Sequence, residues 1–326
     1  MKEQISIALK GIAMGIAEVI PGVSGGTIAF ITGIYQRLLQ AINAINFSLV
    51  ATFKKGGFHS VWNAIDGTFL VSLFAGMAVG VIGGIFTVAR LLHTHPEPLW
   101  GFFFGLIIAS ILILRKEVKK VNFQVTALFA LGAAFALLIT NLTPTEGSTS
   151  LPYVFMSGLF AICALMLPGI SGSFILLILG MYTIIIPTVK NVLVSQSLND
   201  IVVIAVFAFG CLVGVMSFAR VLSWLFHKQP QGTMATMIGF LLGSVHKIWP
   251  WRNVTSIADK HTGSITNITD YNLLASLDKE GYKILSEQMV IPSDYLMSSP
   301  KTVLTLFSLF AGFVLILIID RFTSKK

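Results

Sequence analysis

Charged residues are scarce in this chain of 326 residues. They make up 11% of it, whereas hydrophobic residues make up 55% and the mean hydropathy is +0.85. So little polar surface excludes a soluble domain of this size and predicts a protein embedded in a bilayer. The net charge of +8 does not indicate nucleic-acid binding, because Lys and Arg occur in short groups between apolar runs, as topology signals do.

Cysteine is also scarce, and metal-ligand spacing is absent. The two cysteines, Cys163 and Cys211, both lie in apolar stretches, so neither a disulfide framework nor a metal site is predicted. A cleavable signal peptide is not expected, because the first nine residues run into an apolar segment without a small-residue cleavage pattern. We therefore expect no metal and no cofactor.

A polar, glycine-rich motif interrupts the first apolar segment and occurs again in the second half. It reads EVIPGVSGG at residues 18–26 and LPGISGS at residues 167–173. A constant offset of 147 residues aligns Pro21, Gly22, Ser24, Gly25, Gly33 and Tyr35 with Pro168, Gly169, Ser171, Gly172, Gly180 and Tyr182. A spacing held over this many positions indicates an internal repeat.

Each motif predicts a break in a helix at membrane depth. Proline disfavours helix at the preceding residue and removes a backbone donor, so the first helix should end there. Ser24 is expected to cap a second helix that continues to about Val50. The sequence thus predicts broken or re-entrant hairpins over residues 5–50 and 153–194. Broken backbone at this depth is tolerated only against protein or a polar cavity.

Six further apolar segments have about the length of a membrane span. They cover residues 68–91, 99–114, 123–141, 201–226, 234–249 and 303–319. The predicted fold is therefore an all-α polytopic integral membrane protein with two repeats, residues 1–150 and 151–326, each a hairpin plus three transmembrane helices. The basic groups favour cytoplasmic N- and C-termini and inverted repeats. The polar segment 251–300 is then an extracytoplasmic cap or lid.

The two breaks are candidate anion sites, because the first amides of a helix lack intrahelical partners and favour negative charge. The candidate binding residues there are Ser24, Gly25, Gly26, Thr27, Ser171, Gly172 and Ser173. The alternative is that these small residues only permit a tight helix crossing.

Four charged residues in or near apolar segments are further candidates, because each needs a partner or a cavity in the membrane. Arg90 and Arg220 occupy matching positions in the two repeats and suit a phosphate, although each could simply extend to the interface at a helix end. Arg37 is a weaker candidate. Glu18 is a candidate proton carrier unless it forms a fixed ion pair, because desolvation favours a protonated carboxyl.

The paired motifs and the plan of spans resemble the bacterial family long labelled domain of unknown function 368, which is associated with translocation of undecaprenyl phosphate. The resemblance covers nearly the full chain. It implies a protein of the bacterial inner membrane, not an enzyme, that returns this lipid carrier from the outer to the cytoplasmic leaflet for cell-envelope synthesis. We expect coupling to protons or another cation by alternating access.

Two other classes remain open from the residues alone. A transporter of small organic or inorganic anions would use the same helix ends. A membrane phosphatase would need a nucleophile and acid cluster, and His93 and His95 have none beside them in the sequence.

Overall fold

The computed structural model describes residues 2–20, 24–142, 145–194, 197–259, 265–268 and 281–323. Five helices in this part of the chain are long and apolar enough to cross a membrane. They are α5 (Gly67–Thr94), α6 (Pro96–Leu114), α7 (Phe123–Thr140), α11 (Leu198–Lys228) and α14 (Thr302–Thr323). The membrane region is therefore helical and polytopic, as the sequence predicts.

The predicted span over residues 234–249 consists of a short helix and a 3-10 turn. Helix α12 covers Pro230–Ser244, and a 3-10 turn, η2, follows at Val245–Ile248. Its 15 residues fall short of the roughly 20 that a straight crossing requires.

Each hairpin contains three helices where the sequence predicted two. The first has α1 (Lys2–Val19), α2 (Gly25–Ile31) and α3 (Tyr35–Ala44), and the second has α8 (Leu151–Met166), α9 (Gly172–Ile178) and α10 (Tyr182–Val194). The expectation of one helix from the glycines to about Val50 is thus wrong. Gly33 and Gly180 adopt positive φ angles of 73° and 65°, which glycine tolerates and helices do not. The chain bends by 113° between α9 and α10, at the break that contains Gly180.

The long helices pack in pairs that follow the repeat. Helix α1 packs on α5 as α8 packs on α11, and α6 packs on α14 as α12 packs on α7, so the last two pairs join the halves. In each pair a glycine lies against a backbone carbonyl of the partner: Gly80 against Ile12, Gly210 against Phe155, Gly105 against Leu309, and Gly239 against Phe129. Small residues permit such close approach in membranes.

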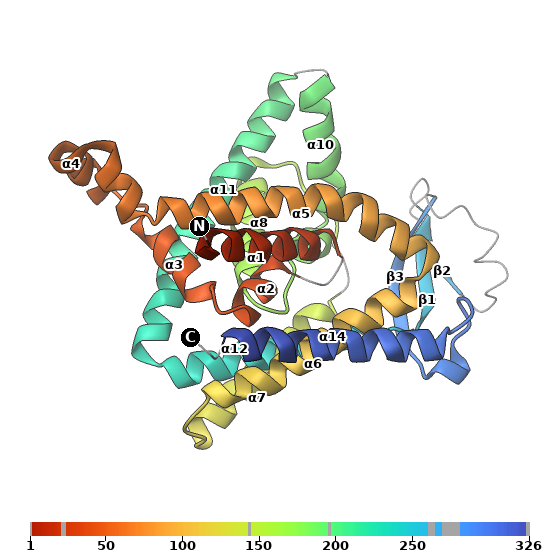
Figure 1. The fold of residues 1–326 in the computed structure, drawn as a ribbon. Helices are drawn as coiled ribbons and strands as arrows, with labels where there is room; N and C mark the ends of the chain where they lie inside the picture. Colours follow the sequence, from red (N-terminus) through yellow and green to blue (C-terminus); the bar gives the residue numbers. More distant parts are fainter. Residues whose placement is uncertain are drawn as a thin grey trace.

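The molecule has two distinct ends (Figure 1). On one, called here the terminus side, α1 begins, α14 ends and the exposed helix α4 (Ser48–Ala64) projects. Basic residues gather on this side in α4, in the 115–120 loop, and at the ends of α11 and α14. A salt bridge of 3.7 Å between Lys116 and Asp320 joins the loop to the end of α14.

The other end, called here the sheet side, carries a three-stranded antiparallel sheet that the sequence analysis did not predict. Strand β1 (Arg252–Asp259) lies between β2 (Ile265–Asn267) and β3 (Tyr282–Met289). The sheet belongs to the polar segment 251–300, which the sequence predicted as a cap or lid.

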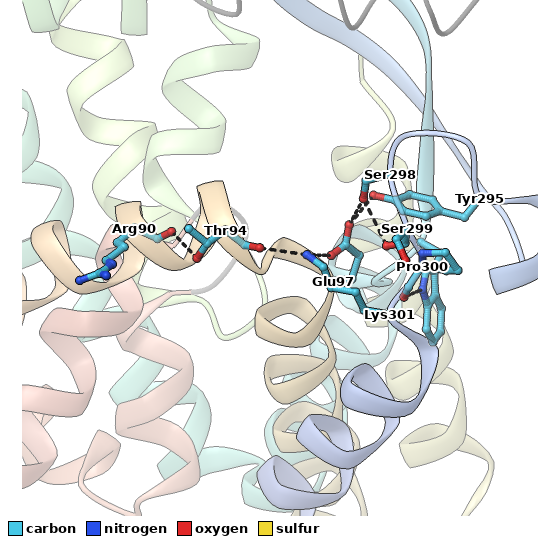
Figure 2. A network of polar contacts seen from close by, with 9 residues as sticks. Arg90, Thr94, Glu97, Tyr295, Ser298, Ser299, Pro300 and Lys301 are labelled. Atoms are coloured by element: carbon cyan, nitrogen blue, oxygen red, sulfur yellow. Dashed lines mark hydrogen bonds and ion pairs between the residues drawn. The ribbon is translucent and has the colours of Figure 1, made fainter.

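Glu97, at the start of α6, attaches the segment before α14 to the helices (Figure 2). Its side chain is fully buried and accepts hydrogen bonds from Tyr295 and Ser298. Lys301 forms a salt bridge with it at 3.3 Å and also donates to the carbonyl oxygen of Thr94. The sheet side is thus held by a buried carboxylate.

The terminus side has a matching attachment without charge. Gln231 follows Pro230 at the start of α12 as Glu97 follows Pro96 at the start of α6. Its Oε1 accepts from the backbone amide of Lys119 at 2.6 Å, in the segment before α7. Each half therefore fixes the segment before the last long helix of the other half.

Candidate functional site

The two glycine-rich motifs lie against each other in the structure. Three hydrogen bonds join the first hairpin to the second break. Ser24 donates to the carbonyl oxygen of Leu165 at 3.1 Å, Tyr35 donates to that of Met166 at 2.6 Å, and Thr27 accepts from the amide of Gly169 at 2.9 Å. We call this contact the seam. It joins residues 131 to 142 positions apart in the sequence.

The seam requires glycine at two positions. A Cβ at Gly26 would collide with the carbonyl oxygen of Leu165, which is the atom that Ser24 also contacts. Gly169 has a φ angle of 86°, and a Cβ there would lie 2.6 Å from the hydroxyl of Ser244. Gly26 therefore permits the contact between the two breaks, and Gly169 permits the second break to pack against α12.

The start of α2 is capped by the chain itself. Ser24 is the N-cap residue, as predicted, and its hydroxyl accepts from the amide of Gly26. The carboxylate of Glu18 accepts from the amide of Gly25 at 2.6 Å. These two amides are therefore not free for a ligand in this structure, which corrects the expectation for the first break. Pro21, Gly22 and Val23 lie outside the described residues.

Glu18 is not held in a fixed ion pair by the residues that the structure describes. Arg37, the partner considered from the sequence, instead forms salt bridges with Glu3 at 2.7 Å and with Asp66 at 2.6 Å. Its guanidinium also lies 4.5 Å from the centre of the Phe69 ring. The charge of Arg37 is compensated twice, so it is the least suited of the predicted phosphate ligands.

A cavity of about 350 Å³, the sheet-side cavity, opens beside the second break. It is lined by Gly169 and Ser171 of the break, by Ser244 at the end of α12, and by residues of α6, α9, η2 and the sheet. Ser171 is 4% exposed, and its hydroxyl contacts that of Ser173 at 2.8 Å. Of the predicted residues, Ser171 is the one that faces this cavity.

Two cations line the sheet-side cavity, and the sequence analysis identified neither. Arg252 begins β1 and forms a salt bridge of 2.8 Å with Glu287 of β3, while its guanidinium lies 4.9 Å from the centre of the Trp100 ring. Lys247 forms no salt bridge with the described part of the chain. Burial, opposed in part by Glu287, lowers the pKa of the Lys247 ammonium, and Arg252 lowers it further.

A signal for this pair was present in the sequence. The run HKIWPWR at residues 246–252 places both cations among aromatic residues directly after an apolar segment. Aromatic and basic residues are typical of the membrane interface, so the run by itself indicates only the end of a span.

A second cavity, of about 360 Å³, lies at the other end of α6 and is called the terminus-side cavity. The end of α2, the C-terminal parts of α6 and α14, and Met234 of α12 line it. Its charged lining residues are Glu117 and Asp320. Ser110 faces it, and Ser110 matches Ser244 of the sheet-side cavity in the repeat.

The seam lies between these cavities. Trp100 of α6 lines one cavity and Ser110 of α6 lines the other, ten residues further along, which is roughly 15 Å along a helix axis. Gly169 belongs to the seam and the sheet-side cavity, and Tyr35 belongs to the seam and the terminus-side cavity. The seam therefore contributes lining residues to both cavities.

Arg90 and Arg220 lie away from the seam. Arg90 is exposed near the sheet-side end of α5, and its side chain points away from the Glu97 cluster (Figure 2). Arg220 is exposed in the last third of α11, which ends on the terminus side. Neither forms a salt bridge with a residue that the structure describes. Gly172, the last predicted residue, packs against the carbonyl of Ala161.

Comparisons with known proteins identify a family and two relatives. The VCA0040-like family model, described as undecaprenyl phosphate translocase-like, matches residues 14–266. A polyprenyl-phosphate transporter of Vibrio cholerae is 40% identical over 269 residues, covering 82% of this chain and 85% of the relative. One of Staphylococcus aureus is 32% identical over 256 residues, covering 74% and 85%.

No solved structure matches the chain. Both relatives are named as transporters rather than enzymes, and their polyprenyl phosphate is the class of substrate that the family resemblance implies. With the family model matching most of its length, this membrane protein belongs to the undecaprenyl phosphate translocase-like family.

Proposed function

We propose that the protein moves undecaprenyl phosphate from the outer to the cytoplasmic leaflet of the bacterial inner membrane by alternating access. The seam between two cavities is the observation that carries this proposal. The tail of the lipid can stay in the bilayer, so only the charged head needs a path through protein. A hydrogen-bonded contact between two broken hairpins, with a cavity on each side, suits a head that passes a single barrier.

The distribution of basic residues supports the orientation. Lys54, Lys55, the 115–120 loop and Lys228 lie on the terminus side, and cytoplasmic ends of membrane proteins are rich in Lys and Arg. The terminus side is therefore cytoplasmic in this proposal, and the sheet is extracytoplasmic. The matched packing of α1 on α5 and α8 on α11 supports inverted repeats.

Arg90 and Arg220 serve in this proposal as the first and last contacts of the head. They match each other in the repeat, they are exposed, and they belong to opposite ends of the molecule. A guanidinium group binds a phosphate with two parallel hydrogen bonds. Arg90 captures the head from the outer leaflet, and Arg220 receives it on the cytoplasmic side.

Glu18 is the proposed coupling residue. The head carries about −1.5 to −2 charges, by analogy with other phosphate monoesters. Moving it inward against an inside-negative potential costs about 2.3 kcal/mol per charge per 100 mV, so an accompanying proton lowers the cost. Protonation weakens the hydrogen bond that Glu18 accepts from Gly25, next to Ser24 of the seam. The seam is then easier to open when a proton is bound.

The test is transfer of a polyprenyl phosphate between leaflets of proteoliposomes under an imposed pH gradient. The wild-type protein should accelerate transfer and respond to the gradient, and Glu18→Gln should transfer without that response. Transfer that responds equally in both would remove Glu18 from the mechanism. No transfer by folded wild-type protein, together with uptake of a small anion, would replace the proposed function.

A further inference from the structure

Two cations line the sheet-side cavity, and one carboxylate lines it with them among the residues that the structure describes. Lys247 comes from η2 and Arg252 from β1, and Glu287 is the acidic residue that lines the same cavity. Like charges that share a partly buried site are unfavourable unless an anion lies between them. An anion of the right size therefore has a place here that the rest of the described structure leaves unfilled.

Arg252 is positioned for such an anion. Its side chain is 15% exposed and is fixed on one side by Glu287 and on one face by the Trp100 ring. A guanidinium has five N–H donors, and the described residues accept a hydrogen bond from Nη1. The remaining donors can form the paired hydrogen bonds that Arg makes with phosphate.

Lys247 of η2 supplies a compact second charge. Its ammonium lies 5.8 Å from the centre of the Phe174 ring on α9 and has no carboxylate within salt-bridge distance among the described residues. The buried hydroxyl of Ser171, on the same break, adds a neutral donor. The three groups come from η2, β1 and the start of α9, and all three line the cavity.

We infer that Lys247, Arg252 and Ser171 bind a phosphate monoester in the sheet-side cavity, with Glu287 as the counter-ion that phosphate competes against for Arg252. This inference rests on the proposed function, and it names the site where the lipid head waits before the seam opens. The sheet then contributes directly to binding, since Arg252 and Glu287 belong to its strands.

The lining also identifies the source of the phosphate. Apolar side chains of Trp100, Leu142, Phe174, Leu177 and Ile284 share the cavity with the polar groups. Inorganic phosphate gains nothing from such a lining, whereas the first isoprenoid unit of a lipid phosphate buries apolar surface against it. The site therefore favours a phosphate that carries a hydrocarbon chain.

The experiment measures binding of farnesyl monophosphate to the full chain in nanodiscs, with inorganic phosphate and farnesol as comparison ligands. We expect Lys247→Gln and Arg252→Gln each to weaken farnesyl monophosphate binding at least tenfold. Arg252→Lys should retain part of the affinity, and Glu287→Gln should bind several-fold more tightly than wild type. Lys228→Gln is the matched control. It changes an exposed cation at the terminus-side end of α11, and it should bind farnesyl monophosphate as the wild type does.

Binding within twofold of wild type in both Gln variants, each with an unchanged melting temperature, would overturn the site. Equal affinity for inorganic phosphate and farnesyl monophosphate would overturn its assignment to a lipid head. A loss of binding in the Gln variants supports the site even if the wild-type protein transfers no lipid, and in that case the proposed function alone fails. Transfer by the wild-type protein together with unaffected binding in the variants would support the proposed function and overturn the binding site.

Discussion

The sheet-side and terminus-side cavities have nearly the same volume, about 350 and 360 Å³, but different charged lining residues. Two cations, Lys247 and Arg252, line the first together with Glu287 of β3. Two carboxylates, Glu117 and Asp320, line the second, and Asp320 forms a salt bridge with Lys116. Both receive a serine from matching positions of the repeat, Ser244 and Ser110. The internal repeat thus supplies two similar cavities, and residues outside the motifs give each its charge.

This difference between the two linings bears on the direction in which the lipid head is proposed to move. Lys247 and Arg252 attract an anion and the exposed Glu117 repels one, which supports capture at the sheet-side cavity and release at the terminus-side cavity in the proposed function. The attachments at the two ends also differ in charge, since Glu97 is a buried carboxylate and Gln231 is neutral. Substitutions that remove these differences test whether they matter.

The largest effect is expected at the charged attachment. Lys301→Met leaves the fully buried carboxylate of Glu97 without its cation and should lower the free energy of unfolding by about 3 kcal/mol. Glu97→Gln should cost less, because it makes the attachment neutral like that of Gln231. Gln231→Ala is the comparison on the terminus side and should cost about 1 kcal/mol.

Denaturant unfolding in mild detergent, followed by tryptophan fluorescence, measures these changes. Trp251 donates to the carbonyl of Pro300, so the probe lies beside the attachment. Equal losses of unfolding free energy in Lys301→Met and Gln231→Ala would contradict the prediction that an unpaired buried carboxylate destabilises the protein more than a lost neutral hydrogen bond.

An intermediate effect is expected at the seam, which separates the cavities. Thr27→Val keeps the shape of the side chain but leaves the buried amide of Gly169 without an acceptor, which costs about 1–3 kcal/mol. Thr27→Ser restores the hydroxyl and should recover most of that loss. Thermal unfolding of the wild type and the two variants in detergent measures this loss of stability. Equal melting temperatures of the Val and Ser variants would show that the hydrogen bond to Gly169 does not stabilise the seam.

The smallest effect is expected in the terminus-side cavity. Glu117 is exposed, so Glu117→Lys should leave stability within about 0.5 kcal/mol of wild type. The new cation should retain the phosphate head and slow leaflet transfer a few-fold, because a pair of charges at contact in a wet site is worth about 1 kcal/mol. Glu117→Gln is the control. Faster transfer in the Lys variant would contradict the assignment of this cavity to release.

The sequence predicted the parts of the fold that depend on local pattern. The offset of 147 residues identified both breaks, and hydropathy identified the long helices. The same alignment contained Gly33 and Gly180, so the additional bend in each hairpin could have been predicted from glycines that recur where a helix was expected. The bend was missed because a single glycine is often tolerated within a helix.

The charges of the site could not be assigned from pattern alone. Arg37 is neutralised by Glu3 and Asp66, which are 34 and 29 residues away in the sequence. Arg252 lines the same cavity as Ser171 of the second break, which is about 80 residues away in the sequence, and β1 pairs with a strand about 30 residues further along. Such contacts depend on tertiary structure, and no local spacing encodes them.

The most direct test of the two-cavity account is labelling from each side of the membrane. Cys163 and Cys211 would be replaced by alanine, and single cysteines introduced as Ile284→Cys in the sheet-side cavity and Gln36→Cys in the terminus-side cavity, both at exposed positions. A membrane-impermeant thiol reagent outside intact cells should label Ile284→Cys alone, and in inside-out vesicles it should label Gln36→Cys alone. Labelling of both variants from the same side would contradict the account, because the seam would then not separate an outer from an inner cavity.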